Sequence, residues 1–122
     1  MPVADTSHGT SGVAERYASS LFELALEAGV IEAVGADLDK FQAMLDDSDD
    51  LKRLVASPVF SSEDQSKAIS AISAKAGISG LAANFLKVVA GNRRLFAVPG
   101  MIVAYREIAA AHRGEITAEV TS

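Results

Sequence analysis

The sequence predicts an all-α fold, a bundle of six helices followed by a short strand-like segment from a second domain. The composition points to helices, because alanine is abundant, aromatic residues are only 6% of the chain and Trp is absent. Alanine costs least in a helix, whereas aromatic and β-branched residues favour strands. The second observation is hydrophobic residues spaced at three and four positions, the period of an amphipathic helix. A length of 122 residues fits one domain.

The first predicted helix covers residues 11–28, with Ser11 as N-cap and Gly29 at the position where a glycine ends a helix. The second covers residues 30–45 and is amphipathic. Its apolar positions are Val34, Leu38, Phe41 and Leu45.

Acidic residues separate the second helix from a short third helix at 49–56. Carboxylates favour the positive N-terminal end of a helix, and the residue before Pro58 avoids helical geometry, so the third helix is short. The fourth covers residues 61–76, beginning with a serine cap and acids and ending at Gly77.

The fifth predicted helix covers residues 79–90 and ends at a Gly-Asn pair. The sixth covers roughly residues 94–113, and Pro99 places the start of its regular part near Val98. Gly114 is expected to end it.

Residues 115–121 alternate polar and apolar side chains, which is the period of a strand. A lone strand has no pairing partner in a helical domain, so we expect a truncated C-terminal domain to begin at 114–122. The polar segment 1–10 is expected to be flexible, which leaves 11–113 as the helical domain.

The charge and motif content exclude several classes of function. A net charge of −5 argues against a nucleic-acid binder and against a membrane-surface anchor. The chain has no cysteine, which excludes disulfides and thiolate metal sites. It has no targeting signal and no apolar run of membrane-spanning length, so we expect a bacterial-type cytoplasm, with membrane association only through partners.

No catalytic, cofactor-binding or metal-binding constellation is recognised, and we expect a non-enzyme. His8 and His112 are interpreted as surface or structural residues. The acids at 46–50 lack the glycine and terminal glutamate of a calcium loop, so capping is preferred over calcium binding. We expect Arg93 and Arg94 to hydrogen-bond helix-end carbonyls or to pair with acidic residues rather than to bind phosphate.

Two predicted helices are apolar over an unusually wide arc. The first, at 11–28, has two adjacent apolar stripes covering roughly 180°, and the fifth, at 79–90, has an arc of roughly 220°. An ordinary surface helix shows a stripe only a little over roughly 100° wide. Either both helices are central and buried all round, or one side of each binds an amphipathic helix from a partner.

Four segments resemble the delta subunit family of F-type ATP synthase, whose mitochondrial counterpart is the oligomycin-sensitivity-conferring protein. The segment AERYASSLFELA at 14–25 is similar to the family's R-Y-A-x-A-L-F-x-x-A pattern. The segment NRRLFAVP at 92–99 is similar to N-x-R-L-x-x-L-P, and HRGEI at 112–116 is similar to the family's junction with a β-containing domain. The segment LVASPVF at 54–60 is a weaker match. The departures are Ser20 and Val98, in place of Ala and Leu.

The resemblance implies a stator role without cofactors. The family's six-helix domain binds the N-terminal helix of the alpha subunit between its first and fifth helices, and its C-terminal domain binds the b-type stalk subunits. The complex lies on the cytoplasmic face of the bacterial inner membrane. The alternative is a self-associating or adaptor helical bundle. The residues expected to bind the alpha-subunit helix are Ala14, Tyr17, Ala18, Leu21, Phe22, Ala82, Phe85, Leu86 and Val89.

Overall fold

The structure is a computed structural model that describes residues 12–57 and 59–121, with side chains described as far as Gly114. It contains six α-helices, one 3-10 helix and no strand in these ranges, which confirms the all-α prediction. The expected flexible segment 1–10, with His8, lies outside the described residues, as do Ser11 and Pro58. The helices are α2 (Gly12–Ala28), α3 (Ile31–Asp47), α4 (Asp49–Ala56), α5 (Ser62–Ala76), α6 (Gly80–Gly91), η1 (Leu95–Ala97) and α7 (Val98–Thr121).

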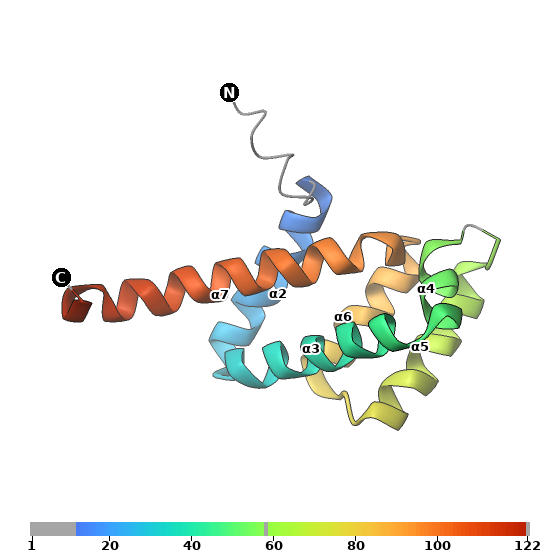
Figure 1. Cartoon of the computed structure of the whole chain (residues 1–122), viewed down its shortest axis with the longest axis horizontal. Helices are drawn as coiled ribbons and strands as arrows, with labels where there is room; N and C mark the ends of the chain where they lie inside the picture. Colours follow the sequence, from blue (N-terminus) through green and yellow to red (C-terminus); the bar gives the residue numbers. More distant parts are fainter. Residues whose placement is uncertain (1–11, 58, 122) are drawn as a thin grey trace.

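The long helix α7 runs along one side of the bundle, and its C-terminal part extends past the other helices (Figure 1). Helix α2 packs most extensively against α7, and α3 also contacts α7. Helices α4 and α5 lie together at the other end of the bundle (Figure 1), where α5 packs along α6. The pairs α2–α7 and α5–α6 are therefore the two main helix pairs.

Serine caps begin two of the helices. The Ser48 hydroxyl accepts the Leu51 N–H at 3.1 Å at the start of α4, and the Ser61 hydroxyl accepts the Asp64 N–H at 3.0 Å at the start of α5. These bonds satisfy N–H groups that have no partner in the first helical turn. The cap predicted at the start of the fourth helix is thus confirmed.

Two glycines end helices as the sequence predicts. Gly29 follows α2 with φ +71, and Gly77 follows α5 with φ +79. The next N–H in each case turns back onto the helix, Val30 to the Ala25 carbonyl at 2.9 Å and Ile78 to the Ser73 carbonyl at 2.8 Å. Glycine is favoured at both positions because it has no Cβ to clash in the left-handed region.

The predicted strand at the C-terminal end is wrong. Helix α7 begins at Val98, as Pro99 indicates, but it continues through Gly114 to Thr121. A strand without a neighbour would leave its N–H and C=O groups unpaired, whereas a continuing helix pairs them internally. Gly114 costs only about 1 kcal/mol inside a helix, so it does not force an end. Whether a second domain begins at 114–122 stays a prediction.

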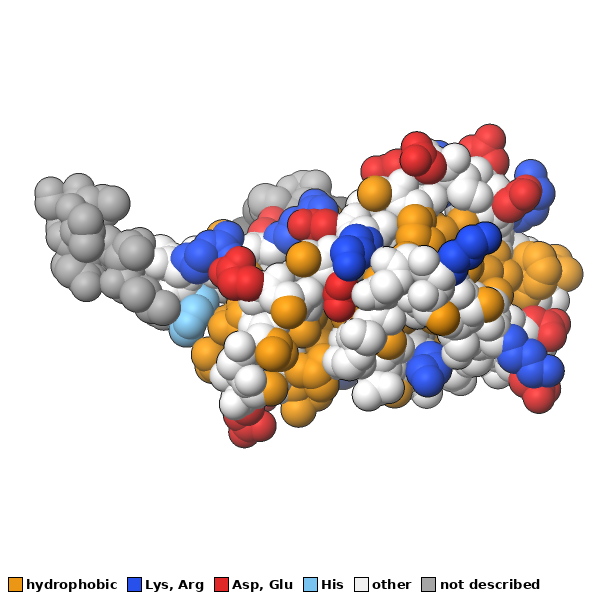
Figure 2. All heavy atoms as spheres, turned by 90° about the horizontal axis from the view of Figure 1, so that it is seen from below, with side chains coloured by type: hydrophobic (Ala, Val, Ile, Leu, Met, Phe, Trp, Pro, Cys, Tyr) orange, Lys and Arg blue, Asp and Glu red, His pale blue; other side chains and the backbone are white. Residues whose placement is uncertain are grey.

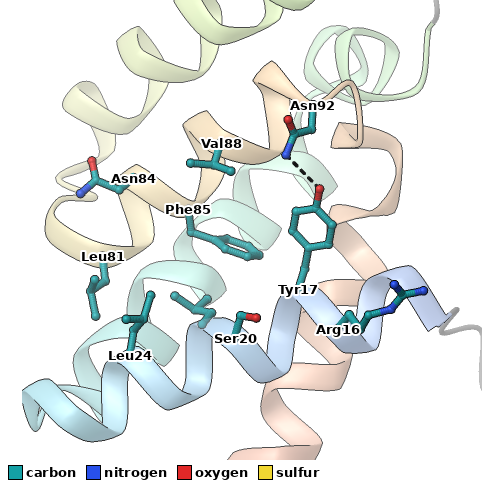
Figure 3. Close-up of a pocket in the computed structure, with 10 residues that line it drawn as sticks. Arg16, Tyr17, Ser20, Leu24, Leu81, Asn84, Phe85, Val88 and Asn92 are labelled. Carbon is teal, nitrogen blue, oxygen red and sulfur yellow. Dashed lines mark hydrogen bonds between the residues drawn. The ribbon is translucent and has the colours of Figure 1, made fainter.

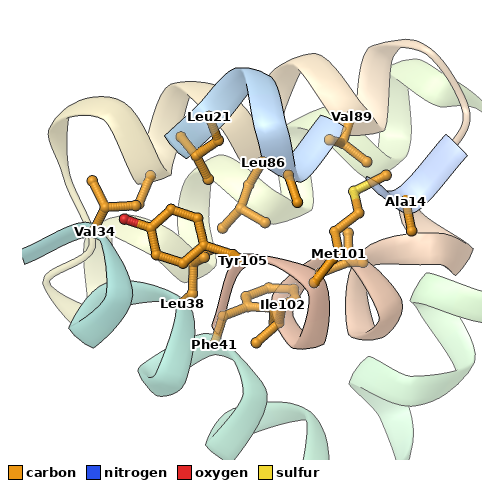
Figure 4. Close-up of a cluster of buried hydrophobic side chains, with 14 of the residues drawn as sticks. Ala14, Leu21, Val34, Leu38, Phe41, Leu86, Val89, Met101, Ile102 and Tyr105 are labelled. Atoms are coloured by element: carbon orange, nitrogen blue, oxygen red, sulfur yellow. The ribbon is translucent and has the colours of Figure 1, made fainter. Parts of the chain in front are cut away.

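The core forms where α2, α3, α6 and α7 meet (Figure 4). Tyr105 of α7 is buried there, and its hydroxyl donates to the Ile31 carbonyl at 2.9 Å. Phe22 of α2 packs on Tyr105 with ring centroids 5.9 Å apart. Burying a large apolar side chain contributes about 1.5–3 kcal/mol, so this cluster is the main source of stability. The largest fully buried side chains are Tyr105, Phe41, Leu38, Ile69, Leu86, Leu95, Met101, Ile102, Val89 and Val98.

Candidate functional site: a groove between two helices

An apolar groove of about 450 Å³ lies between α2 and α6. Its walls are one face of each helix, and side chains from both helices point into the space between them (Figure 3). The residues that line it are Arg16, Tyr17, Ser20, Leu21 and Leu24 from α2, Leu81, Asn84, Phe85 and Val88 from α6, and Asn92, which follows α6.

The groove exists because α2 and α6 each pack mainly on a different partner. Helix α2 is paired with α7 and α6 with α5, so α2 and α6 touch each other less extensively. The groove residues recur at three and four positions along each helix, the spacing of a single helix face. The wide apolar arcs of both helices are thus two faces, one in the core and one in the groove.

Two aromatic side chains join the helices at one end of the groove (Figure 3). The Asn92 side-chain amide donates to the Tyr17 hydroxyl oxygen at 3.0 Å. The Tyr17 and Phe85 rings meet edge to face, with centroids 6.3 Å apart. Leu24 and Leu81 face each other at the opposite end, so α2 and α6 run antiparallel along the groove (Figure 3).

The groove is open to solvent and exposes large apolar side chains. Leu24 is 51% exposed and Val88 is 56% exposed, and both line the groove. Scattered exposed hydrophobic side chains need no explanation, but two on facing helices, above an apolar floor, form a continuous surface that a partner can cover. The view from below shows hydrophobic side chains gathered on one part of that face, with charged side chains of both signs around them (Figure 2). The exposed large hydrophobic side chains outside the groove are Leu26, Val59, Phe96 and Val103.

The structure brings three of the nine predicted binding residues into the groove: Tyr17, Leu21 and Phe85. Leu21 is 2% exposed and forms part of the floor. The other six are buried in the core and do not line the groove. These are Ala14, Ala18, Phe22, Ala82, Leu86 and Val89.

Phe22 shows why the prediction mixed the two faces. Its ring contacts Tyr105 and His112 of α7, with centroids 5.9 and 5.4 Å away. Ala14 and Ala18 lie on the same stripe of α2, where small side chains let α2 approach α7 closely. The stripe of α2 that contains Phe22 therefore faces the core.

Sequence reasoning missed seven groove residues. Leu24, Leu81 and Val88 were recognised as apolar but were not chosen, although the spacing of Leu24 from Tyr17 and Leu21 was the available signal. The polar ones left no hydrophobic signal, because they lie at the edges of the apolar arcs. They are Arg16, Ser20, Asn84 and Asn92.

A second hollow, of about 470 Å³ between α3 and α7, is lined by both charged and apolar side chains and carries ion pairs. Arg106 Nη2 lies 2.6 Å from Asp39 Oδ1, and Arg113 Nη1 lies 3.5 Å from Glu32 Oε2. Burial raises the pKa of Tyr105 at its base to about 12, and the nearby Glu32 charge adds to this. These exposed ion pairs connect α3 to α7, and the hollow offers no apolar surface comparable with the groove.

The acids at 46–50 lie around the break between α3 and α4. Asp49 pairs with Lys52 at 3.9 Å and Asp50 with Arg53 at 3.3 Å, and both acids occupy the first turn of α4. Among the side chains that the structure describes, no group of three or more His, Cys, Asp or Glu is placed to hold a metal ion. Within residues 12–57 and 59–121, no helix combines the length and the apolar character needed to cross a bilayer.

Comparisons with known proteins agree on one family. The model of the ATP synthase delta (OSCP) subunit matches residues 13–122. All of this chain aligns with the ATP synthase subunit delta of Agrobacterium fabrum at 84% identity and with that of Rhizobium meliloti at 72%. The chain spans 65% of the length of both relatives.

The fold is also found in a solved structure. A chain in the cryo-EM structure of the Polytomella F-ATP synthase superimposes with a TM-score of 0.77. The match covers 84% of this chain and 90% of that chain, at 24% sequence identity. The six-helix arrangement is therefore shared with a chain of that complex.

Proposed function

This chain belongs to the ATP synthase delta (OSCP) subunit family, and we propose that it is a non-catalytic stator component of an F-type ATP synthase. The groove between α2 and α6 binds the N-terminal helix of the alpha subunit and fixes this chain to the catalytic head. A further domain that begins near 114–122 binds the b-type stalk subunits. The assembly resists rotor torque during proton-driven ATP synthesis, at the cytoplasmic face of a bacterial inner membrane.

The observation that supports this proposal most directly is the exposed apolar groove. Leu24 and Val88 present about half of their surface to solvent on facing helices, above a floor that includes Leu21. Burial of apolar surface by a partner is favourable at about 25 cal/mol per Å². A helix is the natural occupant, because two parallel walls of side chains accept a third helix whose apolar positions recur at i, i+3, i+4 and i+7.

The length of the groove also suits a short helix. On α2 it extends from Arg16 to Leu24, which is roughly 12 Å at 1.5 Å per residue. Along α6 it extends from Leu81 to Asn92, just past the end of the helix, roughly 16 Å. An occupant of two to three helical turns would cover it.

Two exposed leucines of α2 provide a matched test. Leu24 lines the groove and is 51% exposed, whereas Leu26 is 46% exposed and does not line it. A labelled peptide of the alpha-subunit N-terminus is titrated with the wild-type chain, Leu24→Glu and Leu26→Glu by fluorescence anisotropy. Leu24→Glu should weaken binding at least about tenfold, because a carboxylate would be covered without a partner. Leu26→Glu should bind as the wild type does.

Failure of the wild-type chain to bind the peptide, or equal weakening by both variants, would contradict this placement of the interface. The exposed groove also suits a second copy of the chain, which is the alternative of a self-associating bundle. Sedimentation at micromolar concentration distinguishes the two. A dimer that Leu24→Glu dissociates would support self-association, whereas a monomer that binds the peptide supports the stator proposal.

A further inference from the structure

The groove has one charged end. Of the described residues that line it, Arg16 is the one that carries a charge; the others are apolar or neutral. Arg16 is exposed and forms no ion pair within the described part of the chain. The chain as a whole carries a net charge of −5, and Arg16 also borders a neighbouring hollow that Glu15 and Glu23 line.

The Tyr17 hydroxyl lies at the same end and has a proton to donate. Its oxygen accepts the Asn92 side-chain N–H at 3.0 Å, with the amide oriented as that bond requires. A hydroxyl has one donor and two acceptor positions, and among the described residues the Tyr17 O–H donates no hydrogen bond. The bond to Asn92 holds the phenol in place and leaves its hydrogen for an incoming group.

Two separate sequence segments meet here. Arg16 and Tyr17 belong to the segment AERYASSLFELA, and Asn92 begins the segment NRRLFAVP, 75 positions after Tyr17. The hydrogen bond between them joins the N-terminal part of α2 to the end of α6 (Figure 3). The polar residues of both segments thus form one corner of the groove.

We propose that this corner recognises a carboxylate, an Asp or Glu side chain that flanks the apolar stripe of the docked helix. The Arg16 guanidinium and the Tyr17 O–H are both donors, and a carboxylate has acceptor positions for both once the exposed Arg16 side chain, which points away from Tyr17 in Figure 3, turns towards the groove. This inference rests on the proposed function, since it names the chemistry that the alpha-subunit helix must carry. A carboxylate bound in this corner fixes the register of the docked helix, because it lies at the Tyr17 end while the apolar side chains of that helix cover Leu24 and Val88.

A double-mutant cycle tests the pairing. Each Asp and Glu of the alpha-subunit peptide is replaced in turn by Asn or Gln, and every peptide is titrated against the wild-type chain and Arg16→Gln. Arg16→Gln should weaken binding of the unaltered peptide about threefold, the scale of an exposed charge pair. For one acidic position, neutralising the peptide should cause the same loss, and combining both changes should cause no more.

Lys87→Gln is the matched control, because Lys87 is an exposed cation of α6 that does not line the groove. It removes the same charge, so it measures the general electrostatic effect. Tyr17→Phe keeps the ring against Phe85 but removes the hydroxyl, and it should weaken binding of the acidic peptide more than that of the neutralised one. Arg16→Glu should weaken binding about tenfold and recover with a peptide that carries Lys at the paired position.

The outcomes separate this inference from the proposed function. If the wild-type chain binds the peptide but no acidic position couples to Arg16, the carboxylate corner is wrong and the groove assignment stands. The same conclusion follows if Lys87→Gln and Arg16→Gln weaken binding equally. If the helix terminus rather than a side chain meets Arg16, Arg16→Gln weakens every neutralised peptide alike, which also overturns the inference. If the wild-type chain does not bind the peptide, the proposed function fails and the inference fails with it.

Discussion

Helix α6 has a core face and a groove face two residues apart, and substitutions on the two faces should have opposite consequences. Leu86 is fully buried, whereas Val88 is 56% exposed and lines the groove. Leu86→Ala removes apolar atoms from a packed core and leaves a cavity, which costs about 2–5 kcal/mol. Small domains have a total stability of about 5–15 kcal/mol, so this loss is a large fraction of the total.

Val88→Ala should change stability by no more than about 0.5 kcal/mol, because little of its buried contact is lost. The higher helix propensity of Ala offsets part of that loss. Conversely, Val88→Ala should weaken binding of the alpha-subunit peptide, because it removes contact area from the groove wall.

Urea unfolding followed by far-ultraviolet circular dichroism measures the first effect, and peptide titration measures the second. Both variants should keep the wild-type denaturant slope, so the midpoints compare directly. If Leu86→Ala unfolds at the wild-type midpoint and Val88→Ala is strongly destabilised, the assignment of the two faces is reversed. The binding experiment is interpreted only for a variant whose spectrum is that of the folded chain.

Three further predictions concern single interactions. Because burial raises the pKa of Tyr105 from 10.0 to about 12, the unfolded chain loses this proton before the folded chain does, so stability should fall as pH rises from 10 towards 12. Tyr105→Phe removes the hydrogen bond to the Ile31 carbonyl and should cost about 1 kcal/mol at neutral pH. Because Phe has no ionisable hydroxyl, the urea midpoint of this variant should not show the fall in stability between pH 10 and 12. Ser61→Ala should cost about 1 kcal/mol by removing the cap of α5, and an unchanged thermal midpoint would contradict this. Arg106→Gln should cost at most about 1 kcal/mol, because Arg106 and Asp39 are both about half exposed, and 1 M salt should abolish the difference.

Local chemistry predicted the helices well because each boundary depends on adjacent residues. The Ser61 cap marks the start of α5, Gly77 marks its end, and Pro99 places the start of α7. The end of α7 was predicted wrongly for the opposite reason. The alternation at 115–121 has the period of a strand, but a strand needs a neighbour, and the pattern itself does not supply one.

The groove lies between the two helices that the sequence singled out, but six of the nine residues predicted to bind there lie in the core. Periodicity shows that α2 has two apolar stripes and leaves open which one faces the core. Phe22 and Leu24 illustrate this: both are large and apolar, yet Phe22 packs on α7 and Leu24 is exposed in the groove. The choice depends on which helix lies behind α2, and that is set by packing across the whole chain.

The polar corner depends on still longer-range structure. Tyr17 and Asn92 are 75 positions apart, and nothing in either segment predicts that they meet. Their hydrogen bond joins two helices that pack mainly on different partners, α2 on α7 and α6 on α5. Widening the groove requires breaking this bond, whereas the Leu24 end has no equivalent bond within the described residues. A docked helix should therefore meet a fixed polar end and an adaptable apolar end. Tyr17→Phe should accordingly loosen the fixed end, which faster hydrogen exchange in the first turns of α2 would detect.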